Sequence, residues 1–244
     1  MIDWLRGEFQ EPSVTIAGRS VPLAIRRNAR ATRLTMRLAP DGSAVRITLP
    51  PWCGTRHALA FAQARTLWLE QQLSIVPAAA PVMAGGTLPY RGRTLRIEWT
   101  ERGARRPHLD GEALHCGGPE GALPRRVCAW LEEEALRLLT RDLAEYCARA
   151  ARAAPELKLS RAQRRWGSCS VSKEGPRAIR INWRLVMAPD SIRRSVVAHE
   201  VAHLAHFDHS PAFHAHLAGL FEGEIAQADG WLRQHGRSLY APFG

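Results

Sequence analysis

Long apolar runs and paired cysteines are both missing from this sequence. No segment approaches the roughly 18 consecutive apolar residues of a membrane-spanning helix. The first residues, MIDWLRGEF, are charged early and contain no apolar h-region, so we expect neither a membrane span nor a signal peptide. The five cysteines are scattered, and none belongs to a CxxC pair. This argues against a disulfide framework and a cysteine-only zinc site, and it favours a reducing, cytoplasmic setting.

Acidic residues are scarce in two segments, and these segments contribute much of the net charge of +11. Between Pro12 and Pro40 there are six arginines and no acidic residue, and nine Lys or Arg lie between Arg161 and Arg194. Such a surface is either simply solvated or attracts a phosphate-bearing or otherwise anionic partner. Because the sequence has no recognition helix, zinc finger or RNP-type motif, we expect no sequence-specific reading of nucleic acid.

In the first hundred or so residues, turn signals separate short segments in which apolar and polar residues alternate. This pattern predicts a β-rich region. Hairpins are expected at Gly18, at Asp41-Gly42 and at Arg91-Gly92. Apolar residues then recur every three or four positions from Val127 to Ala150, which predicts one long amphipathic helix. We detect no internal repeat. The prediction is an α+β fold, with a β-rich N-terminal region of basic hairpins and a second, catalytic domain. Their predicted ranges are 1–120 and 121–244.

Histidine is sparse elsewhere, yet six of the ten histidines lie between His199 and His216. His199 and His203 are four residues apart, so on a helix they share one face and can both reach one ion. Glu200 is placed to face water bound to that ion. This is the HExxH arrangement, in which two imidazoles bind zinc and the glutamate acts as general base.

The third metal ligand is predicted from the place where the helix ends. His206 shares the face of His199 but lies about 10 Å farther along a straight helix. Pro211 disfavours helix at Ser210 and favours a new helix that starts there. His209 then lies at a turn from which the chain can fold back, so we predict His209 as the third ligand. The alternatives are two glutamates near the last helix, Glu222 and Glu224.

Three blocks of sequence resemble one known family. RRWGSCS (164–170), INWRLVMAP (181–189) and HEVAHLAHFDHSPAF (199–213) are similar in order and spacing to the YgjP-like, SprT-related family of zinc metallopeptidases. The resemblance implies a zincin-like domain with a short sheet beside the HExxH helix, and Zn²⁺ as the cofactor. It also implies that His209 is a zinc ligand and that a peptide or protein is the substrate.

The resemblance further places two segments beside the site. AIRINWRL (178–185) is expected to be a strand with whose edge an extended substrate could pair, and RRWGSC a nearby loop. In that loop, Arg165 could offer its guanidinium to a carboxylate, a phosphate or the developing oxyanion. Trp166 could form the wall of a pocket or could simply pack. The predicted catalytic residues are therefore Glu200 and Arg165.

The sequence as a whole predicts a zinc-dependent metallohydrolase, and a peptidase in the first place. Three histidines would hold the zinc, and Glu200 would deprotonate its water. Two alternatives stay open. The arginines between Arg161 and Arg194 would suit a nucleotide phosphoanhydride, although a magnesium or manganese site would favour carboxylates over three histidines. The other alternative is a basic, nucleic-acid-associated module with structural zinc. The oligomeric state and the physiological substrate are not predicted.

Overall fold

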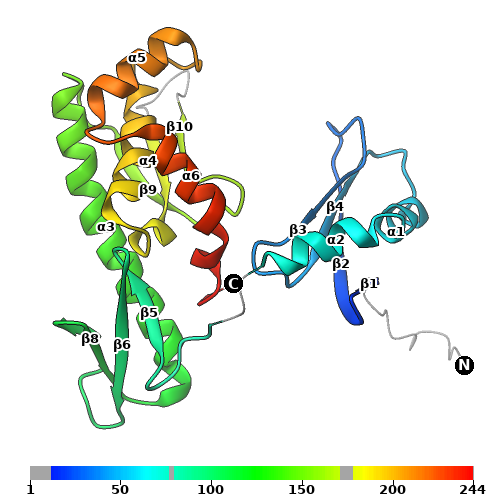
Figure 1. Cartoon of the computed structure of the whole chain (residues 1–244), viewed down its shortest axis with the longest axis horizontal. Coiled ribbons are helices and arrows are strands. Elements are labelled where there is room, and N and C mark those ends of the chain that lie inside the picture. The colour runs from blue at the N-terminus through cyan, green and yellow to red at the C-terminus, as the bar shows by residue number, and fades with distance from the viewer. Residues whose placement is uncertain (1–11, 77–79, 171–177, 244) are drawn as a thin grey trace, which may run out of the picture. The chain divides into compact units, whose positions relative to one another are not determined.

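The computed structural model of the chain forms two compact units (Figure 1). The structure describes residues 12–76, 80–170 and 178–243. The first unit comprises residues 1–78 and the second residues 79–243, and each has its own apolar core. The boundary predicted between 120 and 121 falls inside the second unit. The structure divides the chain earlier because side chains on both sides of residue 120, such as Ile97 and Leu131, are buried in the same core.

The first unit is a four-stranded sheet with two helices on one side (Figure 1). Its elements are β1 (Ser13–Ile16), β2 (Arg19–Arg27), β3 (Thr35–Leu38), β4 (Val45–Leu49), α1 (Thr55–Gln63) and α2 (Thr66–Ser74). The strand order is β1-β2-β4-β3, in which β2 and β4 are parallel and the outer pairs are the predicted hairpins. Alternate strand residues such as Val21 and Ile47 are buried against Ala58 and Leu69 of the helices. The helices therefore cover one face only.

The second unit begins with a sheet of the same topology. Its strands are β5 (Thr87–Tyr90), β6 (Arg93–Thr100), β7 (His108–Asp110) and β8 (Ala113–Gly117). Their order is β5-β6-β8-β7, again with one parallel pair between two antiparallel hairpins. Both sheets open with a turn of two residues at positive φ, Ala17-Gly18 and Arg91-Gly92. The sequence reading that detects no internal repeat is therefore wrong at the level of topology.

A long α-helix, a three-stranded sheet and three further α-helices form most of the rest of the second unit, together with short 3-10 helices at Glu120–Ala122, Trp183–Val186 and Gly236–Tyr240. The α-helices and strands are α3 (Leu123–Arg149), β9 (Glu156–Ser160), β10 (Gly167–Ser170), β11 (Ala178–Asn182), α4 (Asp190–Ala202), α5 (Pro211–Leu220) and α6 (Ile225–His235). The predicted α+β fold is confirmed, and α3 is the predicted amphipathic helix. None of the helices in the described ranges combines the length and the hydropathy that crossing a bilayer requires.

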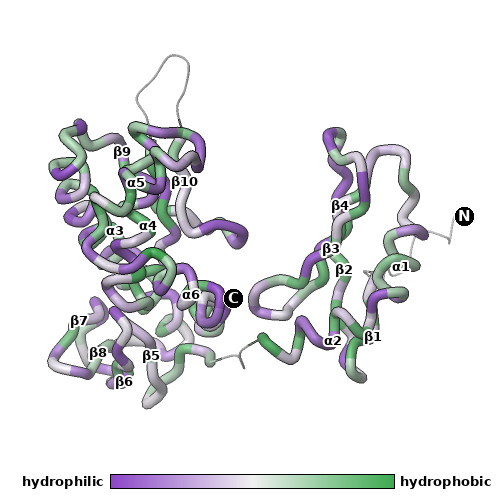
Figure 2. The backbone as a smooth tube through the Cα atoms, turned by 45° about the horizontal axis from the view of Figure 1, so that its top comes forward, coloured by the Kyte–Doolittle hydropathy of each residue, from purple (hydrophilic) through white to green (hydrophobic). Residues whose placement is uncertain are grey.

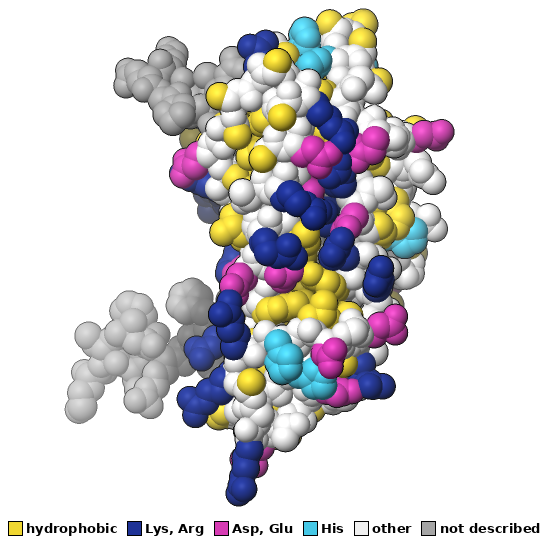
Figure 3. Space-filling model, turned by 90° about the vertical axis from the view of Figure 1, so that its left-hand side faces the viewer, with side chains coloured by type: hydrophobic (Ala, Val, Ile, Leu, Met, Phe, Trp, Pro, Cys, Tyr) yellow, Lys and Arg dark blue, Asp and Glu magenta, His cyan; other side chains and the backbone are white. Residues whose placement is uncertain are grey.

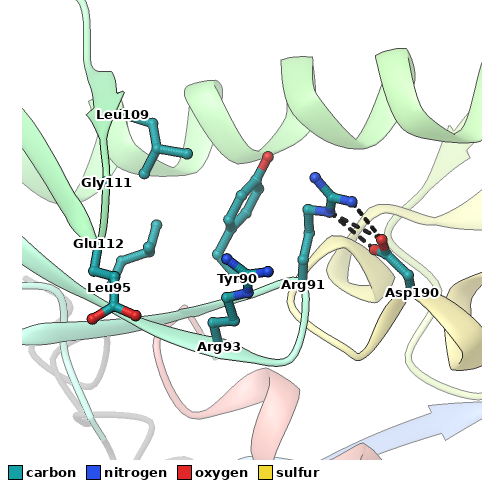
Figure 4. A pocket seen from close by; sticks show the side chains of 8 residues that line it. All are labelled: Tyr90, Arg91, Arg93, Leu95, Leu109, Gly111, Glu112 and Asp190. Atoms are coloured by element: carbon teal, nitrogen blue, oxygen red, sulfur yellow. Dashed lines mark hydrogen bonds and ion pairs between the residues drawn. The ribbon is translucent and has the colours of Figure 1, made fainter.

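The turn between β5 and β6 is attached to the start of α4. The Arg91 N–H donates a 2.8 Å hydrogen bond to the carbonyl oxygen of Val186, and the Arg91 guanidinium pairs with both carboxylate oxygens of Asp190 (Figure 4). A Cβ at Gly92 would lie 3.0 Å from Pro189, so the turn needs glycine for its close approach as well as for its φ of +76°. Arg91 and Asp190 also line a small cavity of about 130 Å³, together with neighbouring residues of β5, β6 and the β7–β8 turn (Figure 4). The repeated sheet thereby fixes the N-terminal end of α4.

Ion pairs hold α4 against α3. Arg193 and Asp142 are both fully buried, and the Arg193 Nε lies 2.7 Å from the Asp142 Oδ2. Arg194 pairs with Glu145 at 2.7 Å and with Glu222 at 2.6 Å. Basic and acidic side chains are interspersed on the face of the second unit that contains α3 (Figure 3). The apolar stretch of α4 packs in the core among neighbouring segments (Figure 2). Helix α4 is thus held by packing on its apolar side and by charges on its polar side.

Candidate metal centre

The histidine motif spans the end of α4, a turn and the beginning of α5. His203 is the C-cap of α4, so His199 and His203 project from the last turn of that helix. Ser210 is the N-cap of α5, and its Oγ accepts a hydrogen bond from the N–H of Phe213. His209 therefore lies between two helices, which is where the Ser-Pro signal places it.

Three imidazoles meet at this turn. The nitrogens that His199, His203 and His209 can offer to a metal all lie within 4.8 Å of one another. The Nε2 atoms of His199 and His209 are 3.3 Å apart. Two ligands of a tetrahedral zinc ion, each about 2.0–2.1 Å from the metal, are separated by about 3.3 Å. The donor set and this spacing fit zinc. Within the described ranges, no second group of three or more such residues gathers in this way.

The hydrogen bonding and burial of the rings leave lone pairs available for a metal. The Nδ1 of His203 lies 2.9 Å from the carbonyl oxygen of His206. Because a carbonyl can only accept, Nδ1 carries the proton and Nε2 keeps its lone pair. Burial lowers the pKa of His199 to about 4, and the neighbouring histidines His203, His209 and His214 act in the same direction. The His199 ring is therefore neutral at pH 7.

A buried phenylalanine supports all three rings. Phe213 is fully buried, and its ring centroid lies 5.0 Å from that of His199, 4.6 Å from that of His203 and 4.9 Å from that of His209. Contact with one rigid aromatic surface restricts the rotamers of the imidazoles. No such role is predicted from the sequence, although Phe213 is the last residue of the block at 199–213.

Glu200, which follows His199 on α4, is buried. It is 5% exposed, and its Oε2 has no hydrogen-bond partner among the described residues. Burial raises the pKa of Glu200 to about 7, although the backbone N–H of Cys169 and the positive charge of Arg165 act in the opposite direction. A desolvated carboxylate with one unengaged oxygen is suited to accept a proton.

The carboxylate of Glu200 rests against a glycine. A Cβ at Gly167 would lie 2.7 Å from the Glu200 Cγ and 2.8 Å from its Cδ, and closer still to Oε1. Gly167 is the first residue of β10, so at this point the strand passes directly against α4. Any side chain at position 167 would displace Glu200. The sequence contains this glycine in RRWGSC but carries no local signal of its contact.

A cavity of about 210 Å³ lies beside His199 and Glu200. Its other lining residues are mostly apolar: Trp166, Gly167, Ser195, Val196, Ile225, Asp229 and Leu232. The Trp166 ring packs closely against the backbone of Gly236, where an added Cβ would lie 2.8 Å from the Trp166 Cζ2. Its ring centroid lies 5.9 Å from that of Tyr240, so the tryptophan is held from two sides. Trp166 therefore both packs and walls the cavity, and these are the two roles considered for it from the sequence.

The other residues predicted for the site lie outside the group of three histidines. Arg165 is exposed, its charge lowers the pKa of Glu200, and no hydrogen bond or ion pair joins it to another described residue. Glu222, an alternative third ligand, accepts hydrogen bonds from Arg194 and from the Tyr146 hydroxyl. Neither Glu222 nor Glu224 joins the histidine group. The catalytic role of Arg165 stays a prediction.

The strand predicted to offer its edge to a substrate lies in the middle of its sheet. β11 pairs with β9 on one side and with β10 on the other, so both of its edges are occupied. The predicted strand is present over Ala178–Asn182, but the prediction that its edge is free for a substrate is wrong. Among the described strands, β10 pairs only with β11, and it therefore has the free edge closest to α4. β10 is formed by residues 167–170, part of the segment predicted as a loop.

Comparison with known proteins assigns this architecture to a family. A family model described as YgjP-like, metallopeptidase domain, matches residues 32–235. The chain belongs to this YgjP-like metallopeptidase family. The match includes the three histidines and Glu200, and it confirms the resemblance predicted from the three sequence blocks. Membership implies a metal-dependent peptidase and a peptide or protein substrate. Comparisons with curated proteins and with solved structures found no match.

Proposed function

We propose that the chain is a zinc-dependent peptidase in which His199, His203 and His209 hold the ion and Glu200 is the general base. The observation that carries this proposal is the meeting of three imidazoles, one of which lines the same cavity as Glu200, whose Oε2 is buried without a partner among the described residues. When bound, zinc supplies a Lewis acid that polarises a peptide carbonyl and makes water acidic near neutral pH.

Glu200 performs the proton transfers in this proposal. Its Oε2 accepts a proton from the attacking water and then delivers it to the nitrogen of the leaving amine. The contact with Gly167 and the hydrogen bond from the Cys169 N–H support this role, because they hold the carboxylate in one position. Arg165 is proposed to stabilise the negative charge that develops on the carbonyl oxygen.

The surroundings of the site suggest how a peptide binds. Its backbone would pair with the free edge of β10, as extended peptides do when they add to a sheet. One side chain next to the cleaved bond would then enter the cavity beside His199. The walls formed by Trp166, Val196 and Leu232 favour an apolar side chain at that position.

Metal analysis and a cleavage assay on the same preparations test the proposal. We expect one zinc ion per chain and cleavage of unfolded casein, both of them lost after treatment with a chelator. Glu200→Gln should keep the zinc and lose cleavage, whereas His203→Ala should lose both. An active Glu200→Gln variant would refute the general-base role. A zinc-loaded protein that hydrolyses a nucleoside triphosphate and leaves casein intact would favour the phosphoanhydride alternative.

A further inference from the structure

The cavity beside His199 and Glu200 has an acidic side chain in a wall that is otherwise apolar. On the side of α6 the wall is formed by Ile225, Asp229 and Leu232. These residues are four and three positions apart, so they lie on one face of the helix. A helix face that turns toward a neighbouring element is normally an apolar stripe. Asp229 interrupts this stripe in the middle.

The folding of α6 does not explain an aspartate at this position. Asp229 is the fifth residue of the helix, beyond the first turn, where a carboxylate caps a helix or stabilises its dipole. Arg233 lies at the spacing of a helical ion pair, yet no ion pair or hydrogen bond joins Asp229 to another described residue. Aspartate is also a weak helix former. Natural proteins break such local rules mainly at functional sites.

The polar groups of the cavity lining favour a ligand that donates hydrogen bonds. The Asp229 carboxylate is an acceptor. Ser195, which also lines the cavity, donates its hydroxyl proton to the carbonyl oxygen of Ile192 at 2.9 Å, so its oxygen can only accept a further hydrogen bond. None of the described residues that line the cavity is a lysine or an arginine, although the chain has a net charge of +11. A cation in the cavity would therefore meet acceptors and no like charge.

The size and the walls of the cavity suit a long side chain. Its volume of about 210 Å³ is far above the roughly 15 Å³ that holds a single water molecule. Trp166, Val196 and Leu232 give it apolar walls. Lysine and arginine combine an apolar methylene stem with a charged end that donates hydrogen bonds. A wholly apolar side chain would fill the walls equally well but would leave Asp229 without a partner.

We propose that Asp229 selects a lysine or arginine side chain of the substrate next to the cleaved bond. This inference rests on the proposed peptidase function and specifies its substrate class. The stem of the side chain contacts the apolar walls, and its ammonium or guanidinium group pairs with the Asp229 carboxylate, which a guanidinium can engage through two hydrogen bonds. The net charge of +11 repels a cationic peptide at long range, so the preference has to come from this local contact.

Cleavage of matched peptides by the zinc-loaded full chain tests this inference. The peptides have blocked ends and eight residues, and they are alike except for one central residue, which is arginine, lysine, norleucine or glutamate. Cleavage on either side of that residue places it next to the cut bond. We expect kcat/KM to be at least about 10-fold higher for arginine or lysine than for norleucine, since a hydrogen bond to a charged group contributes about this factor. Asp229→Asn should lose this preference, and Asp229→Lys should favour glutamate.

The matched control removes one acidic charge from the same helix outside the cavity lining. Glu224 is the N-cap of α6, its side chain forms no capping hydrogen bond, and it does not line the cavity. Glu224→Gln should keep the preference for arginine. Equal loss of the preference in Asp229→Asn and Glu224→Gln would overturn the inference, because overall charge would then explain it. A preference found only with unblocked peptides would also overturn it, since Asp229 would then bind the terminal amine.

Binding without turnover separates this inference from the proposed function. Fluorescence anisotropy with zinc-loaded Glu200→Gln and the same peptides, labelled, gives dissociation constants. The arginine peptide should bind at least about 10-fold more tightly than the norleucine peptide, and the double variant E200Q/D229N should not distinguish them. This binding preference without cleavage by the unsubstituted chain would refute the peptidase proposal and leave the role of Asp229. Cleavage without a preference for arginine or lysine would overturn the role of Asp229 and leave the peptidase. Neither cleavage nor selective binding would overturn both.

Discussion

The contact between Gly167 and Glu200 makes Gly167→Ala a sensitive test of the proposed mechanism. An added Cβ would lie 2.7 Å from the Glu200 Cγ, well inside the ordinary contact distance, which begins at 3.4 Å. The carboxyl group would have to retreat by about 1 Å to restore normal packing. Because the group that moves is the end of a flexible side chain, the cost in folding free energy should be modest, about 1–2 kcal/mol.

The cost in activity should be much larger than the cost in stability. A displacement of about 1 Å in a catalytic group lowers the rate about 100-fold, which corresponds to about 2.7 kcal/mol of lost transition-state stabilisation. The substitution does not touch the histidines, so the zinc content should stay the same. The expected outcome is a folded, metal-loaded protein with kcat/KM reduced about 100-fold.

The measurement combines kcat/KM on a fluorogenic peptide with metal content and the urea unfolding midpoint. Gly219→Ala is the matched control, because it makes the same change in α5 at a position where an added Cβ would meet no atom within 4 Å. It should keep full activity and gain a little stability. Full activity in zinc-loaded Gly167→Ala would refute the reasoning. Loss of zinc together with activity would show that the substitution acts on the ligands instead.

Three further predictions follow from the ion pairs and the ligand set. His209→Ala should weaken zinc binding about 100-fold or more in a competition titration with a chelator while the helix content is unchanged; unaltered affinity would remove His209 from the ligand set. Arg193→Met should lower the free energy of unfolding by about 3 kcal/mol in urea, because it leaves the Asp142 charge buried, and a loss under about 1 kcal/mol would contradict this. Burial alone would raise the pKa of Asp190, but hydrogen bonds from Arg91 and Arg193 outweigh burial and lower the pKa to about 2. The ionised Asp190 therefore contributes about 1 kcal/mol, after solvent screening, to the free energy of unfolding above about pH 4, and this contribution disappears as the pH falls through about 2. The Asp190→Asn variant should not show this pH-dependent loss of stability when its unfolding is measured.

The parts of the site that depend on local sequence could be predicted. The spacing of His199 and His203 on an apolar segment defines one helical face. The Ser210-Pro211 pair ends one helix and begins the next, which places His209 at the turn. Each of these inferences uses residues fewer than five positions apart, where backbone geometry determines proximity. The geometry of the histidine group is local, and so it is accessible from the sequence.

The parts of the site that depend on long-range packing were not predicted. The contact between Gly167 and Glu200 joins residues 33 positions apart, and a glycine in a strand carries no local sign of what lies against it. The pairing of β10 with β11 was missed because Gly167–Ser170 consists of small residues without apolar alternation. The parallel pairing of β2 with β4 was missed for the same reason, since hairpin signals report only neighbouring strands.

The repeated sheets suggest how the two units came to differ in function. Both contain the same turn, Ala17-Gly18 in the first and Arg91-Gly92 in the second, with nearly identical φ values of 49° and 77° against 51° and 76°. In the second sheet, Arg91 of this turn pairs with Asp190 and so fixes the start of α4. The first sheet has alanine there, which cannot form such a pair. One copy thus holds the start of α4, while the other lacks the side chain that could do so, which is the divergence expected when only one copy has to support the helix of the HExxH motif.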